Sequence, residues 1–331
     1  MTELKKFPFL ISEMLLMILC LVNMSPLAAA SSDTLKIIHL TDTHICNLTG
    51  YHPVQITARE HYGQGMEPLK QFLHTVPVQN KVNAVIITGD LIDFFEAETA
   101  AGRMLATQIE QFVPLYFECP LPLYLTLGNH DITSYWVEEP DKRKSFQYQA
   151  HQARATWIRN IPCFQNGIYY VRSFPVGQAT YRFVFLDNGY YLPDGAFIDQ
   201  IQLDWLHYQM QMSRSDPVVI FTHKYLPIPD ANGDGIMFNK KNVLNIDEQT
   251  CSTGFLKVLN ENSNIKAMFV GHGHRNVTEN LILPSTHRIV QIETSGFAND
   301  VKNWRLLKFT ETSILISPCG DDHEKTVIII N

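Results

Sequence analysis

Residues 35–44, LKIIHLTDTH, join an apolar, β-branched run to two side chains that commonly bind metal ions, Asp42 and His44. Runs of this composition are typical of buried β-strands. Four further runs of the same kind, each followed by polar residues, occur at 84–87, 123–127, 218–221 and 268–270. Because open α/β sheets place their sites just beyond the carboxyl ends of the strands, we expect these polar residues to lie together.

The polar residues form five motifs in a fixed order along the chain: Asp42-Thr43-His44, Gly89-Asp90-Leu91-Ile92-Asp93, Gly128-Asn129-His130-Asp131, Thr222-His223 and Gly271-His272-Gly273-His274. A single Asp-x-His after a strand is more often a turn or a helix cap, and Gly-Asp and Gly-Asn pairs are ordinary turn formers. Turns alone do not readily explain all five motifs in one chain, so together they indicate a metal site.

The donor types narrow the choice of metal. Carboxylate oxygen, imidazole nitrogen and amide oxygen suit Zn, Mn, Fe, Ni or Co better than Ca or Mg alone. The motifs offer more ligand contacts than one tetrahedral ion needs, which predicts two ions about 3.5–4 Å apart. Asp90 is the carboxylate best placed to bridge them. Asp93 can accept a hydrogen bond from a ligand histidine, although the sequence leaves open which one.

A metal pair of this kind suits the hydrolysis of an anionic phosphoester. Two cations neutralise the charge of the ester and lower the pKa of a shared water, which yields a hydroxide nucleophile near neutral pH. The departing alkoxide is a poor leaving group until it is protonated. A histidine that titrates near neutrality suits that role as general acid.

The pattern D-x-H, G-D-x-x-D, G-N-H-D, H, G-H-x-H resembles the calcineurin-like metallophosphoesterases over residues 35–274. The resemblance implies an α/β fold, a four-layer αββα sandwich of two packed mixed β-sheets, with a dinuclear metal site at the carboxyl ends of the strands. It also implies two sets of metal ligands: Asp42, His44, Asp90 and His274 for the first ion, and Asp90, Asn129, His223 and His272 for the second. His130 would face the substrate phosphate as the catalytic acid, with Asp131 orienting it.

The chain departs from one branch of this superfamily. Purple acid phosphatases carry a tyrosine three residues after the bridging aspartate, whereas this chain has Asp93 there. A purple Fe(III) centre is therefore not expected, and the generic branch fits better. The histidines outside the motifs have no partner pattern and are interpreted as structural or surface residues. His61 and Tyr62, in the first long loop, are alternative candidates for a pocket.

Strands and helices alternate through the first half of the chain, and strands follow one another later. We expect helices at 66–76, 96–112, 144–158, 198–212 and 252–262. Further strands are expected at 169–174, 181–187, 288–293, 304–309, 313–317 and 327–330, and a long loop at 46–65. Because no linker separates these elements, residues 31–331 are predicted to form one metallophosphoesterase domain.

The first thirty residues have the features of a cleaved signal peptide. Lys5 and Lys6 give a basic start, residues 7–22 are mostly apolar, and residues 28–30, Ala-Ala-Ala, offer a small-residue cleavage site before Ser31. The cleanly apolar stretch is much shorter than the ~20 residues of a membrane span, so no stable span is expected after cleavage. An uncleaved anchor is the alternative.

Export is therefore expected, to a bacterial periplasm or the extracellular space, with a eukaryotic secretory pathway as the alternative. Two glycosylation sequons, at Asn47 and Asn276, lie within three residues of proposed ligands, where a glycan would crowd the site, so we interpret them as chance matches. Five cysteines follow the leader: Cys46, Cys119, Cys163, Cys251 and Cys319. An odd number leaves at least one free thiol or an intermolecular bridge, and the pairing is not readable.

The 331-residue chain has a formal net charge of -7 and a pI of about 6.0, which argues against a general nucleic-acid surface. The expected partner is a small phosphoester, and the oligomeric state stays open. Aromatic residues in segments 132–161, 188–197 and 224–241 are candidates to line a substrate pocket, or else they pack these loops onto the fold. The predicted activity is hydrolysis of phosphodiesters, or of both ester types. The alternatives are a strict phosphomonoesterase, a nuclease and a metal-binding protein without catalysis.

Overall fold

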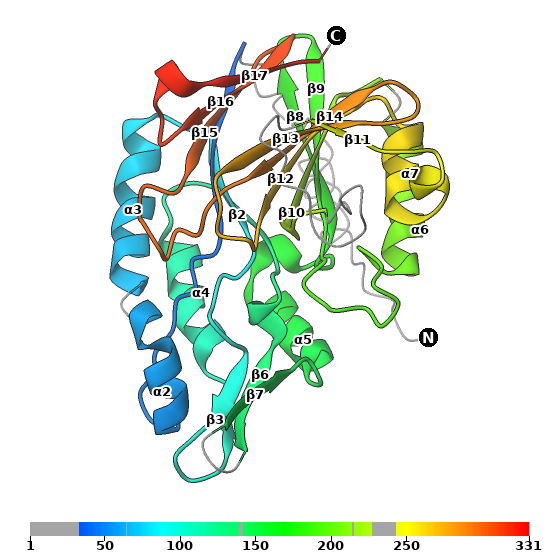
Figure 1. The fold of residues 1–331 in the computed structure, drawn as a ribbon. Helices are drawn as coiled ribbons and strands as arrows, with labels where there is room; N and C mark the ends of the chain where they lie inside the picture. Colours follow the sequence, from blue (N-terminus) through cyan, green and yellow to red (C-terminus); the bar gives the residue numbers. More distant parts are fainter. Residues whose placement is uncertain (1–32, 64, 139–141, 214, 227–242, 331) are drawn as a thin grey trace, which may run out of the picture. The chain divides into compact units, whose positions relative to one another are not determined.

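Two β-sheets stacked face to face form the centre of the fold, with helices on both outer faces (Figure 1). The computed structural model describes residues 33–63, 65–138, 142–213, 215–226 and 243–330, which belong to a unit spanning Asp33–Asn331. The expected signal peptide lies outside the described residues and stays a prediction. Among the helices of the described part of the chain, none is both long and apolar enough to cross a membrane.

The first sheet has six strands in the order β17-β16-β15-β1-β2-β5. Its strands are β1 (Leu35–Leu40), β2 (Ala84–Thr88), β5 (Leu123–Thr126), β15 (Arg305–Phe309), β16 (Ser313–Pro318) and β17 (Thr326–Ile329). β1, β2 and β5 are parallel, and the three tail strands pair antiparallel beside β1. Parallel strands are covered on both faces, which explains why they read as continuous apolar runs in the sequence.

The second sheet has seven strands in the order β11-β13-β14-β12-β10-β9-β8. Its strands are β8 (Tyr170–Val176), β9 (Ala179–Phe185), β10 (Val218–Lys224), β11 (Val243–Asn245), β12 (Ile265–Gly271), β13 (Val277–Ile282) and β14 (Arg288–Glu293). β9, β10, β12 and β14 are parallel, whereas β8 and β13 pair antiparallel at either side. Both sheets are thus mixed, as predicted, although β11 and β13 were not expected.

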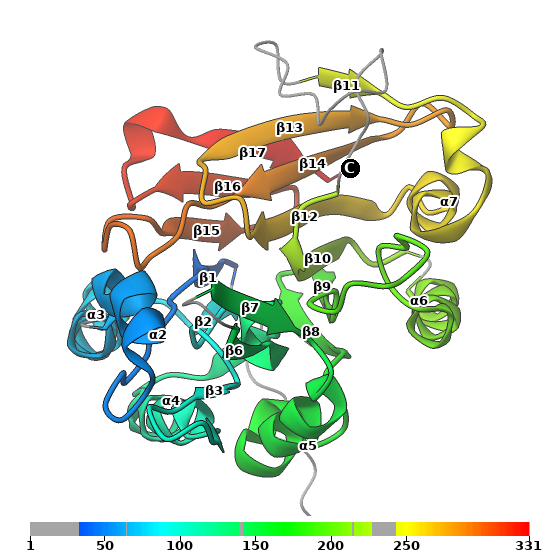
Figure 2. The same cartoon turned by 60° about the horizontal axis from the view of Figure 1, so that its bottom comes forward.

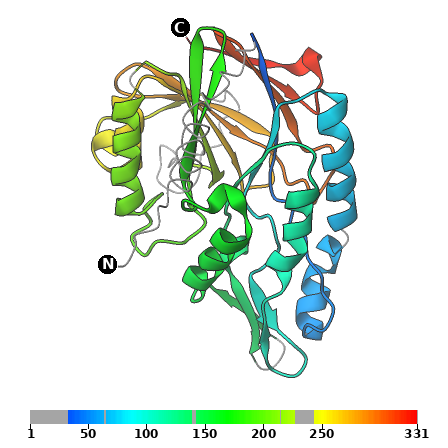
Figure 3. The ribbon, with the colours of Figure 1, turned by 180° about the vertical axis from the view of Figure 1, so that it is seen from behind.

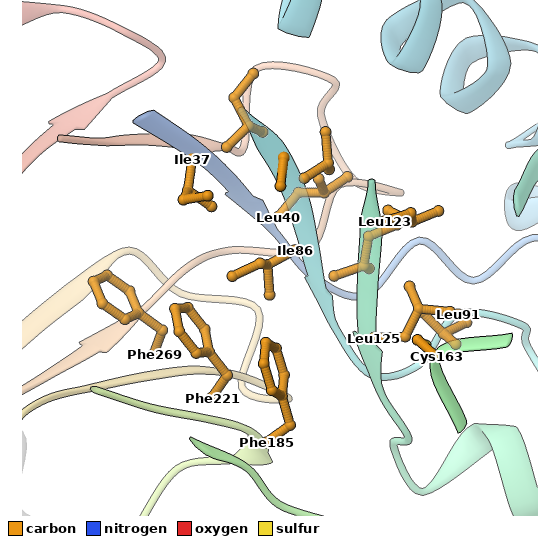
Figure 4. Close-up of a cluster of buried hydrophobic side chains, with 14 of the residues drawn as sticks. Ile37, Leu40, Ile86, Leu91, Leu123, Leu125, Cys163, Phe185, Phe221 and Phe269 are labelled. Carbon is orange, nitrogen blue, oxygen red and sulfur yellow. The ribbon is translucent and has the colours of Figure 1, made fainter. Parts of the chain in front are cut away.

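One apolar core fills the space between the sheets. Side chains alternate along a strand, so Phe183 and Phe185 of β9 belong to this inner core while Val184 packs with the outer helices. The Phe221 ring of β10 stacks between Phe185 and Phe269, at centroid distances of 5.3 and 5.2 Å. Figure 4 shows these three rings, from three neighbouring strands, facing aliphatic side chains of the six-stranded sheet.

Helices complete the four layers. α3 (Met66–Gln79) and α4 (Gln108–Glu118) cover the six-stranded sheet, and α6 (Gln200–Met212) and α7 (Gly254–Glu261) cover the seven-stranded sheet (Figures 1 and 3). Each helix buries an apolar face against its sheet: Phe72 and Phe112 belong to the large cluster that continues into the core, and Leu206 and Val258 belong to the cluster on the other outer face. The four-layer αββα arrangement implied by the sequence motifs is confirmed.

A third, small sheet lies at the end of the sandwich toward which β1 and β2 run (Figures 1 and 2). Its order is β4-β3-β6-β7, built from β3 (Glu96–Glu98), β4 (Met104–Leu105), β6 (Ser134–Glu138) and β7 (Lys142–Phe146). Two helices flank it, α2 (Pro53–Arg59) and α5 (Ala150–Asn160). The sequence did not predict this sheet, and it places new side chains beside the motif loops.

The helix expected at 96–112 is wrong in its first half. Residues 96–105 form the hairpin β3–β4, and α4 starts only at Gln108. The turn depends on Gly102, whose φ of +72° is unfavourable for other residues, and on a bond from the Thr99 N–H to the Arg103 carbonyl. Although the apolar residues are spaced as in a helix, the glycine turn makes this segment a hairpin.

Two further expectations need correction. The helix expected at 144–158 begins at Ala150, because Lys142–Phe146 pairs as β7 with β6. The loop expected at 46–65 contains α2 and a 3-10 turn, Glu60–Tyr62. Pro53 starts α2 at the first helical position, where its missing N–H costs nothing, and the His52 ring accepts a bond from the Val54 N–H.

Candidate metal centre

The five sequence motifs meet at one edge of the sandwich. Parallel strands present their carboxyl ends to the same edge, so the residues that follow β1, β2 and β5 approach those at the ends of β10 and β12. Backbone bonds join the first two loops: the Asp42 N–H donates to the Gly89 carbonyl, and the His44 N–H donates to the Asp90 carbonyl.

One group of donors comprises Asp42, His44 and His274, whose ligand atoms all lie within 4.8 Å of one another. His274 Nε2 lies 3.1 Å from Asp42 Oδ1 and 3.3 Å from His44 Nε2. The other carboxylate oxygen of Asp42 accepts bonds from the Thr41 hydroxyl at 2.7 Å and the His272 backbone N–H at 3.0 Å. One oxygen is thus held by the protein, and the other faces the histidines.

A second group comprises Asp90, His223 and His272, again with ligand atoms within 4.8 Å of one another. His223 Nε2 lies 3.2 Å from Asp90 Oδ2 and 3.1 Å from Asn129 Oδ1. The structure therefore brings all seven predicted ligands into two neighbouring sets, with the amide of Asn129 in the second set.

Asp90 lies between the two groups. Its Oδ2 is 3.2 Å from His223 Nε2 on one side and 3.6 Å from His44 Nε2 on the other. Its Oδ1 accepts the His130 backbone N–H at 2.8 Å, so the carboxylate has a fixed orientation. His130 forms a third donor group with His44 and Asp90. Of the three carboxylates beside the histidines, Asp90 is the one that lies within 4 Å of a ring nitrogen from each donor set.

Backbone strain is concentrated at these residues. Eight non-glycine residues of the described chain have positive φ, and five of them are predicted ligands: Asp42, His44, Asp90, His272 and His274. Such conformations cost free energy in ordinary residues and persist where the surroundings enforce them, commonly at functional sites. The motif glycines have a related role, because a Cβ at Gly128 would overlap the Asp90 carboxylate, and one at Gly271 would overlap Asp42.

The structure identifies the partner of Asp93, which the sequence left open. Asp93 Oδ1 lies 3.0 Å from His44 Nδ1, so it orients the ring that points Nε2 toward Asp42 and Asp90. Arg59 of α2 forms a two-pronged ion pair with the same carboxylate. Tyr62 stacks flat on His44 at 4.6 Å, and the Arg59 guanidinium lies 4.8 Å from the Tyr62 ring centre.

The orientation of His130 differs from the expectation. His130 Nδ1 lies 2.7 Å from the Asp93 backbone carbonyl, which holds the ring and leaves Nε2 as the nitrogen for other chemistry. The Asp131 carboxylate instead accepts the backbone N–H groups of Ile92 and Gly128, at 3.0 and 2.6 Å. Asp131 therefore joins two motif loops and does not orient the His130 ring. Each of its two carboxylate oxygens is already bonded to a buried backbone N–H group.

Electrostatics at the centre favour bound cations. Burial alone would raise the pKa of Asp42, but bonds to His274 and His44 hold it well below its usual value. Burial likewise opposes the ionised form of Asp90, yet nearby His223 and His130 lower its pKa. Burial lowers the pKa of His44, but bonds to Asp42 and Asp93 outweigh this effect and raise it to about 10. Buried carboxylates that draw protons onto their neighbours fit a site for positive ions.

The two histidines of the second donor set have pKa values shifted in opposite directions, and the pKa of the proposed acid is lowered. Burial opposes the charged form of His223, but the charge of Asp90 raises its pKa to about 9. Burial, together with the charge of His223, lowers the pKa of His272 to about 4. Burial also lowers the pKa of His130. The donor chemistry, imidazole with carboxylate and one amide oxygen, thus fits the transition metals that the motifs indicate.

A cavity of about 910 Å³ adjoins the donor groups at His272. Its walls come from the loop after β9, the residues after β10 and the start of α7. Two of the three segments proposed to line a pocket do so, through Asn188–Phe197 and the described residues from Lys224. The described residues of segment 132–161 do not line this cavity; Trp136 belongs to the small sheet and packs near Tyr148.

Sequence reasoning missed some residues that support the centre. Arg59 lay in the segment expected to be a loop, and Pro53 was the one signal for its helix. Asn188 was missed because its role is tertiary; its Oδ1 accepts the backbone N–H groups of His223 and Lys224. The five cysteines beyond residue 33 are free thiols, so no disulfide supports the site.

The sequence matches the model of the calcineurin-like phosphoesterase family over residues 35–276. Among solved structures it is similar to a dimetal phosphatase from Danio rerio, at 14% identity and a TM-score of 0.56, covering 90% of this chain and 99% of that one. It is also similar to GAP50, the anchor in the inner membrane complex of Plasmodium, at 12% identity and a TM-score of 0.50, covering 91% and 90%. No curated protein matches it.

The two solved structures share little sequence identity with this chain, so their similarity indicates only a common fold. The family match, by contrast, runs from β1 through the last histidine motif and so includes every candidate ligand described above. The chain belongs to the calcineurin-like phosphoesterase family, and it is a metallophosphoesterase, a hydrolase of phosphoester bonds.

Proposed function

We propose that this enzyme is an exported phosphoesterase that hydrolyses phosphodiesters, or both ester types, with two transition-metal ions. The proposed ligands are Asp42, His44 and His274 for one ion, Asn129, His223 and His272 for the other, and Asp90 for both. The observation that carries the proposal is the position of the Asp90 carboxylate between the two donor sets. The ions are Mn, Fe, Zn, Ni or Co, which the donor set does not separate further.

When bound, the ions would supply the positive charge that neutralises a phosphoester and activates water. The protein's part is to hold the donors in place. Asp93 and Arg59 lock the His44 ring, and the Thr88 carbonyl accepts from His223 Nδ1 at 2.9 Å. Such outer partners fix which ring nitrogen faces the ion.

We assign the role of general acid to His130. Its Nδ1 is held by the Asp93 carbonyl, so a protonated ring can donate from Nε2 toward a leaving oxygen. The ring is packed edge-on against His44, at 4.7 Å, and lies 6.1 Å from Tyr135 of the small sheet. His130 therefore has a fixed direction beside the donors, which suits proton transfer to a leaving oxygen.

The distribution of cations supports a diester preference. A monoester dianion favours extra fixed positive charges, but three arginines near the centre are paired with buried carboxylates: Arg59 with Asp93, Arg154 with Asp187 and Arg275 with Glu293. Lys224 stands beside the ligand His223 and contacts the Tyr191 ring. These three paired arginines have less charge to offer a second phosphate charge, and a diester carries only one.

Export is proposed from the leader sequence alone. The mature chain should begin near Ser31, because a small-residue cleavage site follows the basic start and the short apolar run. N-terminal sequencing of the protein recovered from outside the cytoplasm measures this start. A cytoplasmic, full-length product that begins at Met1 would contradict the proposal.

Asp90→Asn should weaken the binding of both ions. The substitution removes charge at the one carboxylate that touches both donor sets, so the loss should reach at least about 10–100-fold in metal affinity. Elemental analysis of the dialysed protein gives the metal content, and Asp204→Asn on the exposed face of α6 is the matched control. A mutant that retains two tightly bound ions would assign the bridging role to another residue.

His130→Ala should retain the metals and lose turnover, by roughly 10²–10⁴-fold on alkyl esters. The loss should be smallest on p-nitrophenyl esters, because p-nitrophenolate leaves with little help from an acid. The measurement is kcat/KM on matched alkyl and nitrophenyl esters, with His151→Ala on exposed α5 as the control. An equal loss on both esters would instead assign His130 to phosphate binding.

The ester preference is tested by kcat/KM for bis-p-nitrophenyl phosphate against p-nitrophenyl phosphate under one metal condition. We expect the diester to be hydrolysed as well as the monoester or better. A monoester preference above about a hundredfold, near 2.7 kcal/mol in transition-state binding, would overturn the diester assignment. Hydrolysis of neither ester by the metal-loaded protein would favour the non-catalytic alternative, and release of nucleotides from single-stranded DNA would favour the nuclease.

A further inference from the structure

The cavity beside the metal centre has one end at the proposed ligands. His272 is both a lining residue and a member of the second donor set. Asn188 and Lys224 also line the cavity, and Asn188 holds the backbone of His223 and Lys224 through its Oδ1. A group attached to a phosphate bound at the donors can therefore extend directly into the cavity.

The walls away from the ligands are mainly apolar. They include Leu192, Phe197, Leu226, Phe255 and Leu256. Phe197 stacks on Phe255 at 4.5 Å, and Phe255 belongs to the buried cluster beneath α6 and α7. A volume of about 910 Å³ with such walls and a few polar groups at one end is typical of a site for an organic ligand.

Lys224 lies at the boundary between the two ends. Its Nζ donates to the Tyr190 carbonyl at 3.2 Å and lies 3.6 Å from the centre of the Tyr191 ring. The ring and the carbonyl thus place the cation at the phosphate end of the cavity. One positive charge at this boundary complements the single negative charge of a diester.

Two acidic residues, Asp194 and Asp199, also line the cavity, and each is bound to the local backbone. Asp199 Oδ1 accepts the Gln202 N–H at 2.8 Å and caps α6. Asp194 Oδ1 accepts the Ala196 N–H at 3.1 Å within its own turn. Each carboxylate thus has a backbone donor of its own, and apolar atoms make up most of the remaining wall.

We propose that the cavity binds the apolar alkyl or aryl substituent of a phosphodiester, which makes bulky, hydrophobic diesters the preferred substrate class. This inference rests on the proposed diester activity and deepens it. The phosphate lies at the donors, Lys224 marks the boundary, and the apolar group reaches Leu226 and Leu256. Each methylene that becomes buried in the cavity should then raise kcat/KM by up to about fourfold, because it stabilises the bound transition state.

The test is a series of alkyl p-nitrophenyl phosphodiesters with methyl, butyl and octyl groups, under one metal condition. We expect kcat/KM to rise at least about thirtyfold from methyl to octyl. In Leu256→Gln, a half-buried lining residue, this rise should shrink at least about threefold. Ile201→Gln, which makes the same type of change on exposed α6, should leave the rise unchanged. Equal kcat/KM across the series, or a rise that Leu256→Gln does not alter, would overturn the inference.

A binding measurement separates this inference from the proposed function. Octylphosphonate and methylphosphonate are not hydrolysed, so calorimetric titration of the metal-loaded protein gives Kd values without turnover. Tighter binding of octylphosphonate, by at least tenfold in the wild type and less in Leu256→Gln, supports the apolar cavity even if every ester proves inert. Equal Kd values overturn the cavity proposal, whereas inert esters with selective binding overturn only the proposed diester activity.

Discussion

The carboxylate of Asp90 is the constraint on which the centre depends. The Asp90 backbone has a positive φ in the loop after β2. Its carboxylate accepts the His130 backbone N–H and lies within 3.6 Å of one histidine from each donor set. Gly128 is the partner of this arrangement, because any side chain there would occupy the space of the carboxylate. The loops after β2 and β5 are therefore fitted to each other around one buried charge, which is costly without opposite charge nearby.

The remaining buried charges are arranged in the same way. Asp93 is paired on two sides, with the His44 ring and with Arg59, and its backbone carbonyl holds His130. One residue thus orients both a proposed ligand and the proposed acid. Arg59 lies on α2, outside the motif loops. A helix without any motif residue therefore helps to hold Asp93 and, through it, His44 in place. Removing one partner would leave the other charge buried and unpaired, which costs more than the pair contributes.

The two sides of the centre differ in chemistry. On the side of the small sheet, Tyr135 lies 6.1 Å from the His130 ring, with the Arg143 guanidinium over its face, while Arg59 lies over Tyr62 and pairs with Asp93. The cavity between the β9 loop and α7 is mainly apolar beyond Lys224, although Asp194 and Asp199 also line it. The general acid and the organic substituent of a substrate are therefore assigned to different walls. The sandwich core beneath, with Phe221 stacked between two other rings, fixes the strand ends that carry both walls.

The sequence by itself determined the strands that carry the motifs, the order of the motifs and their meeting at one edge. Buried parallel strands are apolar on both faces, so they can be recognised from continuous apolar runs in the sequence alone. Parallel neighbours also point their carboxyl ends to the same edge of the sheet. The tertiary structure alone decided the small sheet, the pairing of Asp93 with His44 and the true partners of Asp131. These features depend on contacts between residues far apart in the chain, 49 positions for His44 with Asp93 and 39 for Asp131 with Ile92. Local periodicity carries no information on such contacts, and strand pairing overrode the helical pattern at 96–112 and 144–158.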